Sequence, residues 1–148
     1  MAPKPIPDGY HTVTPYLVIQ GAAKLLDFLK GAFEAKELFR MPQSDGTIMH
    51  AEVKIGDSIV MMGEACGQHK PMPCSLYLHV TDADAVYKRA LQAGATSTME
   101  PADQFWGDRT AGVKDPAGNQ WMIGTHKEDV PPEELRKRAE ALQKQHAN

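Results

Sequence analysis

The chain has 148 residues, a formal net charge of −3, and hydrophobic and charged shares of 42% and 24%. This length allows one domain, or two small similar halves that share a core. The negative charge argues against a nucleic-acid or anionic-membrane partner, because no basic face is available to neutralise phosphates. No apolar run approaches membrane-spanning length.

The segment MAPKPIP at the start lacks the apolar core of a signal peptide and predicts an extended, Pro-rich lead-in. The two cysteines, Cys66 and Cys74, flank a loop. With no secretion signal, we expect reduced thiols and a cytoplasmic protein.

The first half of the chain predicts the order strand, helix, strand, strand, strand. Apolar residues recur at the helical period over Ala22–Phe33, whereas β-branched or alternating runs indicate strands. The strands are expected over residues 12–19, 36–41, Ile48–Ile55 and 58–62.

After a linker over residues 63–73, the same order starts again. A strand over 75–80 leads to a helix that Asp82 caps and Gly94 ends. Strands over 96–100, Asp108–Lys114 and 120–125 follow. The last two are joined by the turn DPAGN at 115–119, in which Pro fixes φ and Gly or Asn accepts a positive φ. Residues 131–148 predict a third helix.

The two halves form an internal repeat with a shift of 61 residues (77 − 16), which aligns Tyr16 with Tyr77 and Met61 with Met122. We therefore expect an α+β fold of two paired βαβββ modules that form a curved mixed sheet around a cleft, with a C-terminal helix. The modules span about 10–64 and 74–127 within a domain over 1–130, and a helical tail spans 131–148.

Strand alternation indicates which side chains face the cleft, because successive residues point to opposite faces of a sheet. In the strand over 75–80, the apolar residues belong under a helix, so the alternate residues face the cleft. The cleft-facing set is Thr14, Tyr16, Met61, Ser75, Tyr77, His79 and Met122, with His50 and Glu52 sharing one face of their own strand.

The paired βαβββ pattern and its motifs resemble the vicinal oxygen chelate superfamily and, within it, the PhnB-like branch. The superfamily includes glyoxalase I, extradiol dioxygenases, fosfomycin-resistance enzymes and bleomycin-resistance binding proteins. The motifs that carry the resemblance are TPYLV at 14–18, IMHAE at 48–52 with GDS at 56–58, DQFWGDR at 103–109, and Asp115-Pro116 with Gly118. The resemblance spans roughly residues 7–132.

Metal enzymes of this superfamily bind a divalent ion through residues on the first and last strand of each module. The resemblance places those positions at Thr14, Met61, Ser75 and Met122. Hydroxyl and thioether groups are poor ligands for such an ion. We therefore expect no metal at these positions and no cofactor, with a divalent ion as the alternative.

Two further groups are candidates for the site. His50 and Glu52 suit a general base with its orienting carboxylate, or a plain ion pair. Phe105 and Trp106 suit stacking on a planar ligand while Arg109 binds an anionic group. Alternatively, Trp106 closes the end of the cleft and Arg109 pairs with a nearby aspartate, Asp108 or Asp103.

The leading hypothesis is a metal-free protein that binds a small organic ligand, similar to the bleomycin-resistance type, and the resemblance implies a homodimer. A metal-dependent lyase, isomerase or dioxygenase that uses His50, Glu52 and His79 is one alternative. A metal-free acid/base enzyme that uses His50 is another. The sequence leaves open whether the protein is an enzyme.

Overall fold

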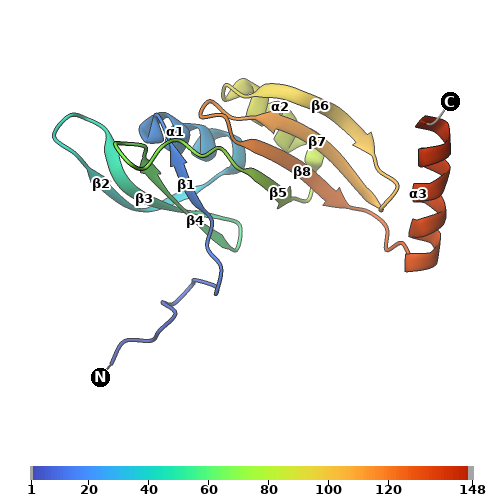
Figure 1. The fold of residues 1–148 in the computed structure, drawn as a ribbon, viewed down its shortest axis with the longest axis horizontal. Helices are drawn as coiled ribbons and strands as arrows, with labels where there is room; N and C mark the ends of the chain where they lie inside the picture. The colour runs from blue at the N-terminus through green and yellow to red at the C-terminus, as the bar shows by residue number, and fades with distance from the viewer. Residues whose placement is uncertain (1, 147–148) are drawn as a thin grey trace.

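The computed structural model describes residues 2–146 as two similar halves side by side, with a helix at the C-terminal end (Figure 1). The first half contains β1 (Tyr16–Ile19), α1 (Ala22–Phe33), β2 (Lys36–Pro42), β3 (Ile48–Ile55) and β4 (Ser58–Glu64). The second half contains β5 (Ser75–His79), α2 (Ala83–Gln92), β6 (Thr96–Asp103), β7 (Asp108–Lys114) and β8 (Gln120–His126). The helix α3 (Pro132–His146) follows.

Each half forms its own four-stranded mixed sheet, in the order β1-β4-β3-β2 in the first half and β5-β8-β7-β6 in the second. The first strand of each half runs parallel to the last, and the other neighbours are antiparallel. The predicted α+β fold of two paired βαβββ modules with a C-terminal helix is confirmed. The two sheets are separate units within the described chain.

The strand register shows that the repeat is structural. Tyr16 lies opposite Met61 in the parallel pair of the first sheet, and Tyr77 lies opposite Met122 in the second. Both pairs keep the shift of 61 residues that the sequence predicted.

The same shift relates the two side chains that cap the helices. Glu64, at the end of β4, accepts hydrogen bonds from the backbone N–H groups of Gly21 and Ala22 at 2.7 and 3.0 Å. Thr125, 61 residues later (125 − 64), accepts one from the N–H of Ala83 at 2.8 Å. These bonds satisfy donors that have no partner within a helix. The last strand of each module therefore contributes to the start of the helix of that module, and at α2 the predicted cap Asp82 also accepts a hydrogen bond from Ala85 N at 3.1 Å.

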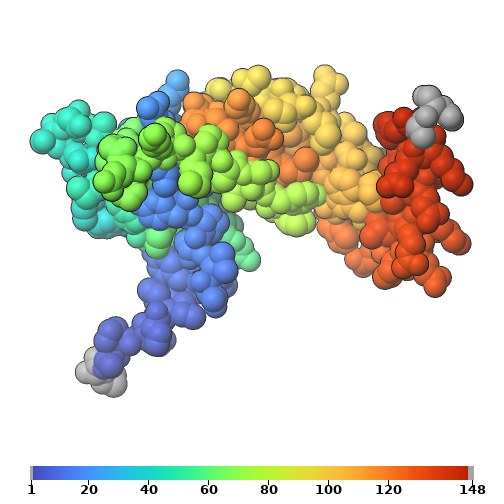
Figure 2. All heavy atoms as spheres, viewed as in Figure 1, coloured from blue at the N-terminus to red at the C-terminus, as the bar shows by residue number. Residues whose placement is uncertain are grey.

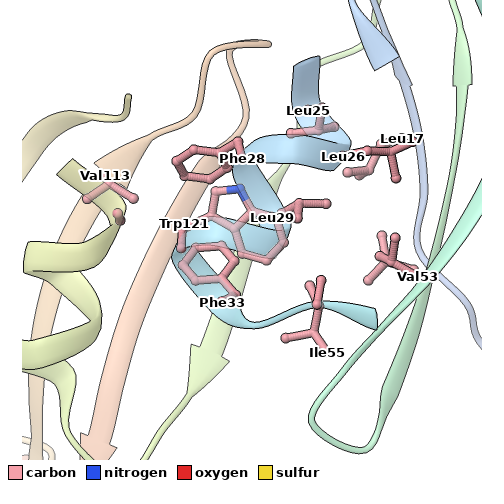
Figure 3. Packing of buried hydrophobic residues seen from close by; sticks show 14 of the residues in the cluster. Leu17, Leu25, Leu26, Phe28, Leu29, Phe33, Val53, Ile55, Val113 and Trp121 are labelled. Atoms are coloured by element: carbon pink, nitrogen blue, oxygen red, sulfur yellow. The ribbon is translucent and has the colours of Figure 1, made fainter. Parts of the chain in front are cut away.

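The hydrophobic core runs across both modules because α1 and α2 each cover one sheet face and also contact each other. The ring of Phe33, on α1, lies 4.9 Å from the ring of Trp121, on β8 (Figure 3). Trp121 is 3% exposed and belongs to this core. Burying such side chains stabilises the fold by roughly 1.5–3 kcal/mol each.

The predicted turn at 115–119 closes the hairpin of β7 and β8. The N–H of Asp115 donates to the carbonyl of Asn119 at 2.9 Å, and Gly118 adopts a φ of 97°. The buried Asp115 carboxylate also accepts a hydrogen bond from Trp121 Nε1 at 2.9 Å. The turn is therefore joined to the core through the Asp115 side chain, and the buried Asn119 joins it to Cys74 at the start of the second module.

The predicted strand over 12–19 is too long, because β1 begins only at Tyr16. Pro15 has no N–H group to extend the ladder, although its carbonyl accepts a hydrogen bond from Met61 N at 2.9 Å. Residues 2–14 precede it, and the first of them project from the first module, away from the end that carries α3 (Figure 2).

The third helix ends at His146, and the last two residues of the predicted 131–148 tail lie outside the described residues. None of the helices within residues 2–146 has the length and apolar character needed to cross a membrane.

Candidate functional site

Each sheet has one face covered by its helix and a second face, which we call the open face. Alternation along the strands places side chains of β1, β2, β3 and β4 on the first open face, and side chains of β5, β7 and β8 on the second. The first open face carries Tyr16, Phe39, His50, Glu52 and Met61, and the second carries Tyr77, His79, Asp108, Met122 and His126.

On the first open face, His50 joins a carboxyl group to a tyrosine. Its Nε2 lies 2.8 Å from Glu52 Oε2, and its Nδ1 lies 3.2 Å from the hydroxyl of Tyr16. The Phe39 ring lies 6.1 Å from the imidazole ring. The structure thus places His50 and Glu52 on one face, as the sequence predicted, and adds Tyr16 and Phe39 as neighbours of His50.

On the second open face, a buried carboxylate takes the central place. Asp108 is 6% exposed; it accepts a hydrogen bond from the Tyr77 hydroxyl and pairs with His126 Nδ1 at 2.7 Å. His79 Nε2 lies 3.8 Å from the same carboxylate, and its ring lies 4.8 Å from that of Tyr77. Asp108 therefore positions Tyr77 and His126 within the second open face.

These contacts shift the pKa values of the groups that make them. Burial raises the pKa of Asp108, but hydrogen bonds from Tyr77 and His126 outweigh it and leave this pKa below its usual value. Burial and the bond to Asp108 raise the pKa of Tyr77. Bonds to Asp129 and then to Asp108 raise the pKa of His126. Asp108 is therefore ionised, and Tyr77 is protonated, at neutral pH.

Each tyrosine of the open faces lies directly over a glycine of the neighbouring strand. A Cβ at Gly63 would lie 2.8 Å from the Tyr16 hydroxyl oxygen, and one at Gly124 would lie 2.7 Å from that of Tyr77. At both distances the tyrosine would have to shift to admit a side chain. The glycines therefore leave room for the hydroxyl ends of Tyr16 and Tyr77, which are 49% and 43% exposed.

The aromatic loop between β6 and β7 borders the second open face. Trp106 Nε1 donates to the hydroxyl of Tyr77 at 3.4 Å, and Phe105 packs edge-on against Trp106 with ring centroids 5.2 Å apart. The carbonyl of Phe105 accepts a hydrogen bond from Arg138, on α3, at 3.2 Å. Trp106 thus lies next to Tyr77, and α3 holds the loop.

Arg109 does not join this group, and its expected role as a cleft anchor for an anionic ligand needs correction. Its Nε and Nη2 bind the carboxylate of Asp84 at 2.7 and 3.0 Å, and its Nη1 binds Asp103 at 3.2 Å. Asp84 belongs to α2, so Arg109 lies on the helix-covered face of its sheet. Of the aspartates named as alternative partners, Asp103 makes this pair and Asp108 lies on the other face.

The four positions at which related enzymes hold a metal do not offer suitable ligands. Thr14 precedes β1, Ser75 begins β5, and Met61 and Met122 lie half-buried in the last strands. Neutral hydroxyl and thioether groups do not fit a divalent ion. The absence of a metal remains a prediction.

Within one chain, the structure does not bring His79 together with His50 and Glu52, the three residues of the alternative metal site. His79 belongs to the second module and lies near Asp108, whereas His50 and Glu52 pair within the first. Within residues 2–146, no group of three or more His, Cys, Asp or Glu side chains could hold a metal ion.

Two cavities lie near these groups. One, of about 870 Å³, lies between the modules, where Phe33, Trp121 and residues of α2 line it on the helix-covered side, together with β5 and the β3–β4 turn. The second, of about 410 Å³, lies on the first open face, where Glu52 and Met61 meet the N-terminal segment and Thr14.

Sequence reasoning missed Asp108 and His126 as members of the site. Alternation contains the signal, because His126 lies two and four residues after Gly124 and Met122 on the same face. The sequence pattern does not indicate that Phe39 lies beside His50 or that Gly63 lies beneath Tyr16, because both depend on contacts between strands.

The fold and the paired open faces define a protein of two βαβββ modules whose exposed tyrosines flank acidic groups. Residues 10–123 match the profile of the Glyoxalase/Bleomycin resistance protein/Dioxygenase superfamily. The chain belongs to this superfamily, which confirms the resemblance seen in its motifs.

Relatives and solved structures agree with this assignment. An uncharacterized protein of Mycobacterium tuberculosis (strain H37Rv) is 40% identical over 134 residues, which cover 83% of this chain and 79% of that protein. TioX from Micromonospora sp. ML1 has a similar structure, with a TM-score of 0.67, 27% identity, and coverage of 78% of this chain and 98% of TioX.

Two more distant structures share the fold. TnmS3, an antibiotic binding protein from Streptomyces sp. CB03234, gives a TM-score of 0.63 at 22% identity, over 79% of this chain and 96% of TnmS3. The PhnB protein from Bacillus cereus gives a TM-score of 0.63 at 16% identity, over 78% of this chain and 99% of that chain.

Proposed function

We propose that this protein binds a small organic ligand on its open faces, without a divalent metal. The observation that carries the proposal is that each open face presents a half-exposed tyrosine over a glycine, and that this tyrosine is linked to a carboxyl group, directly for Tyr77 and through His50 for Tyr16. Aromatic rings bind flat apolar molecules, and they also attract cations. The ligand is a flat ring system that carries a positive charge or hydrogen-bond donors.

The ring systems of the two faces favour this ligand class. Tyr16 and Phe39 flank His50 on the first face, and Tyr77 and Trp106 adjoin each other on the second. TnmS3 is an antibiotic binding protein with the same fold. We extend that use of the fold to this chain as part of the proposal.

We further propose that the protein is a homodimer in which the first open face of one copy and the second open face of its partner form one cleft. Contacts between the modules run mainly through α1 and α2, and β1 and β5 lie at sheet edges. Exposed apolar side chains such as Phe39 and Tyr77 favour burial in such an assembly.

Titration with proflavine, a flat aromatic cation, tests ligand binding. Anthraquinone-2-sulfonate, a flat anion, serves for comparison. We expect proflavine to bind more tightly, and Tyr16→Ala and Tyr77→Ala each to raise its Kd about tenfold, as lost ring contacts predict. Leu91→Ala, at an exposed site on α2, is the control. If neither tyrosine variant changes the Kd of proflavine, the proposed site is wrong.

Elemental analysis of the purified protein tests the metal part of the proposal separately. We expect no stoichiometric divalent metal. A metal that is present at one ion per chain and survives dialysis contradicts it.

A second candidate function is a metal-free acid/base enzyme, which the 2.8 Å contact between His50 and Glu52 favours. In this function His50 moves the proton and Glu52 orients the imidazole ring. Deuterium exchange into a panel of carbonyl compounds in D₂O measures proton abstraction. Activity that survives both His50→Ala and Glu52→Gln excludes this candidate.

A further inference from the structure

The N-terminal segment, residues 5–12, lies on the first open face. Ile59 shares that face with Met61, because Val60 and Met62 point into the helix-covered core. Yet Ile59 is only 7% exposed. Its Cδ1 would lie 3.7 Å from a Cβ at Gly9, so the backbone of the segment covers it.

A turn in the segment produces this contact. The N–H of Tyr10 donates to the carbonyl of Pro7 at 3.1 Å, and Gly9 adopts a φ of 86°, which favours glycine. Pro5 and Pro7 restrict the backbone on the way into the turn. The segment thus enters the turn with reduced freedom and loses less entropy on ordering.

Space remains beneath the segment. The cavity of about 410 Å³ has Tyr10, His11 and Thr14 on one side and Glu52 and Met61 on the other. Its volume falls within the range of small-molecule sites. A segment that only shielded Ile59 would pack against the sheet without such a space.

The Glu52 carboxylate in this cavity can still bind a ligand. His50 pairs with Oε2 of Glu52, and among residues 2–146 no hydrogen bond is made to Oε1. The Glu52 side chain retains 15% exposure. Oε1 can therefore accept a hydrogen bond from a ligand in this cavity, which Met61 also lines.

We propose that the N-terminal segment forms a wall of the ligand site and that Tyr10 and His11 contact the ligand. This inference rests on the proposed function, and it adds a third element to the site besides the two sheets. His11 offers a hydrogen bond and Tyr10 an aromatic surface to the ring system that Glu52 anchors.

Proflavine binding to variants of the full chain tests the contacts. Tyr10→Ala and His11→Ala are each expected to raise the Kd about fivefold, and removal of residues 2–9 more than about tenfold. Asp8→Ala is the matched control, since Asp8 pairs with Lys4 at an exposed position of the same segment. Circular dichroism shows that each variant is folded.

If the shortened chain and both point variants bind proflavine as the full chain does, the segment is not a wall, although the ligand site stands. If Glu52→Gln and the tyrosine variants of the open faces also leave the Kd unchanged, the proposed function itself fails.

Oxidation of Met61 tests the position of the segment without any ligand. Hydrogen peroxide should oxidise Met61 several times faster once residues 2–9 are removed, whereas Met49, already 52% exposed, should react at an unchanged rate. Peptide mass spectrometry measures both. Equal rates for Met61 in the two chains overturn the inference.

Discussion

Gly63 and Gly124 determine the shape of the open faces because each lies beneath a tyrosine ring. Neither glycine has a positive φ, so backbone conformation does not require them. The requirement is space: a Cβ at Gly124 would lie 2.7 Å from the Tyr77 hydroxyl oxygen and 2.9 Å from Cε1.

Gly124→Ala should therefore push the Tyr77 ring away from Asp108. We expect a loss of about 1–3 kcal/mol in the free energy of unfolding, as in other overpacked sites, and weaker proflavine binding. Urea unfolding and titration measure the two effects. Gly31→Ala is the control, because a Cβ there meets Ala93 Cβ at an ordinary 3.5 Å. An unchanged unfolding curve for Gly124→Ala contradicts the expected contact.

His126 gives stability a pH dependence, because bonds to Asp129 and Asp108 raise its pKa in the folded state. A raised pKa means that this contribution is fully present below the unfolded value of about 6.5 and is lost as pH rises through the folded value. His126→Gln should lower the Tm at acidic pH and have less effect at alkaline pH.

Thermal unfolding across this pH range measures the difference between the wild type and His126→Gln. His69→Gln, at an exposed position in the linker, is the control. A difference in Tm that stays constant with pH would show that the pairs of His126 add no pH-dependent stability.

Some helices, strands and turns could be predicted from the sequence and others could not. Ala22–Phe33 and the turn at 115–119 were predicted because local periodicity and turn chemistry decide them. The start of β1 was not, since the lost N–H of Pro15 outweighed a β-branched run. Strand ends such as Glu64 depend on pairing with other strands, which the local pattern does not contain.

The residues of the candidate site were likewise predictable only in part. Alternation placed Tyr16 and Tyr77 on the correct face, because period two follows from strand geometry alone. Arg109 was assigned to the ligand although it is adjacent to Asp108 and therefore faces the opposite side. Its main partner, Asp84, lies 25 residues away, and only the packing of α2 on the sheet reveals the pair.

The helix α3 has no fully buried residue within its described length, and it is joined to the aromatic loop by a hydrogen bond from Arg138. Arg138 donates to the carbonyl of Phe105 at 3.2 Å and to Glu128 at 2.7 Å. We infer that these bonds hold Trp106 against Tyr77.

Arg138→Ala should free the loop without unfolding the domain. We expect acrylamide to quench Trp106 more strongly, whereas Trp121 stays protected in the core, and the Tm to change by less than about 2 °C. Arg136→Ala, at an exposed position on the same helix, is the control. Equal quenching in both variants would exclude a role of α3 in positioning the loop.

Within one chain, the two modules do not pack their open faces against each other. The modules meet mainly through α1 and α2, and the ring contact between Phe33 and Trp121 lies on the helix-covered side. A second copy could bring a first and a second open face together. The proposed homodimer would then contain two equal clefts.

Mixing two variants tests this arrangement. In a Tyr16→Ala dimer both clefts lack one ring, and in a Tyr77→Ala dimer both lack the other. If each cleft combines the first sheet of one copy with the second sheet of its partner, a mixed dimer has one cleft with both changes and one intact cleft. Unfolding and refolding the two variants together should therefore restore a fraction of tight proflavine sites that neither variant has alone.

Light scattering that gives a monomer mass contradicts a cleft shared between two copies. A refolded mixture that binds proflavine no more tightly than either variant alone contradicts it as well.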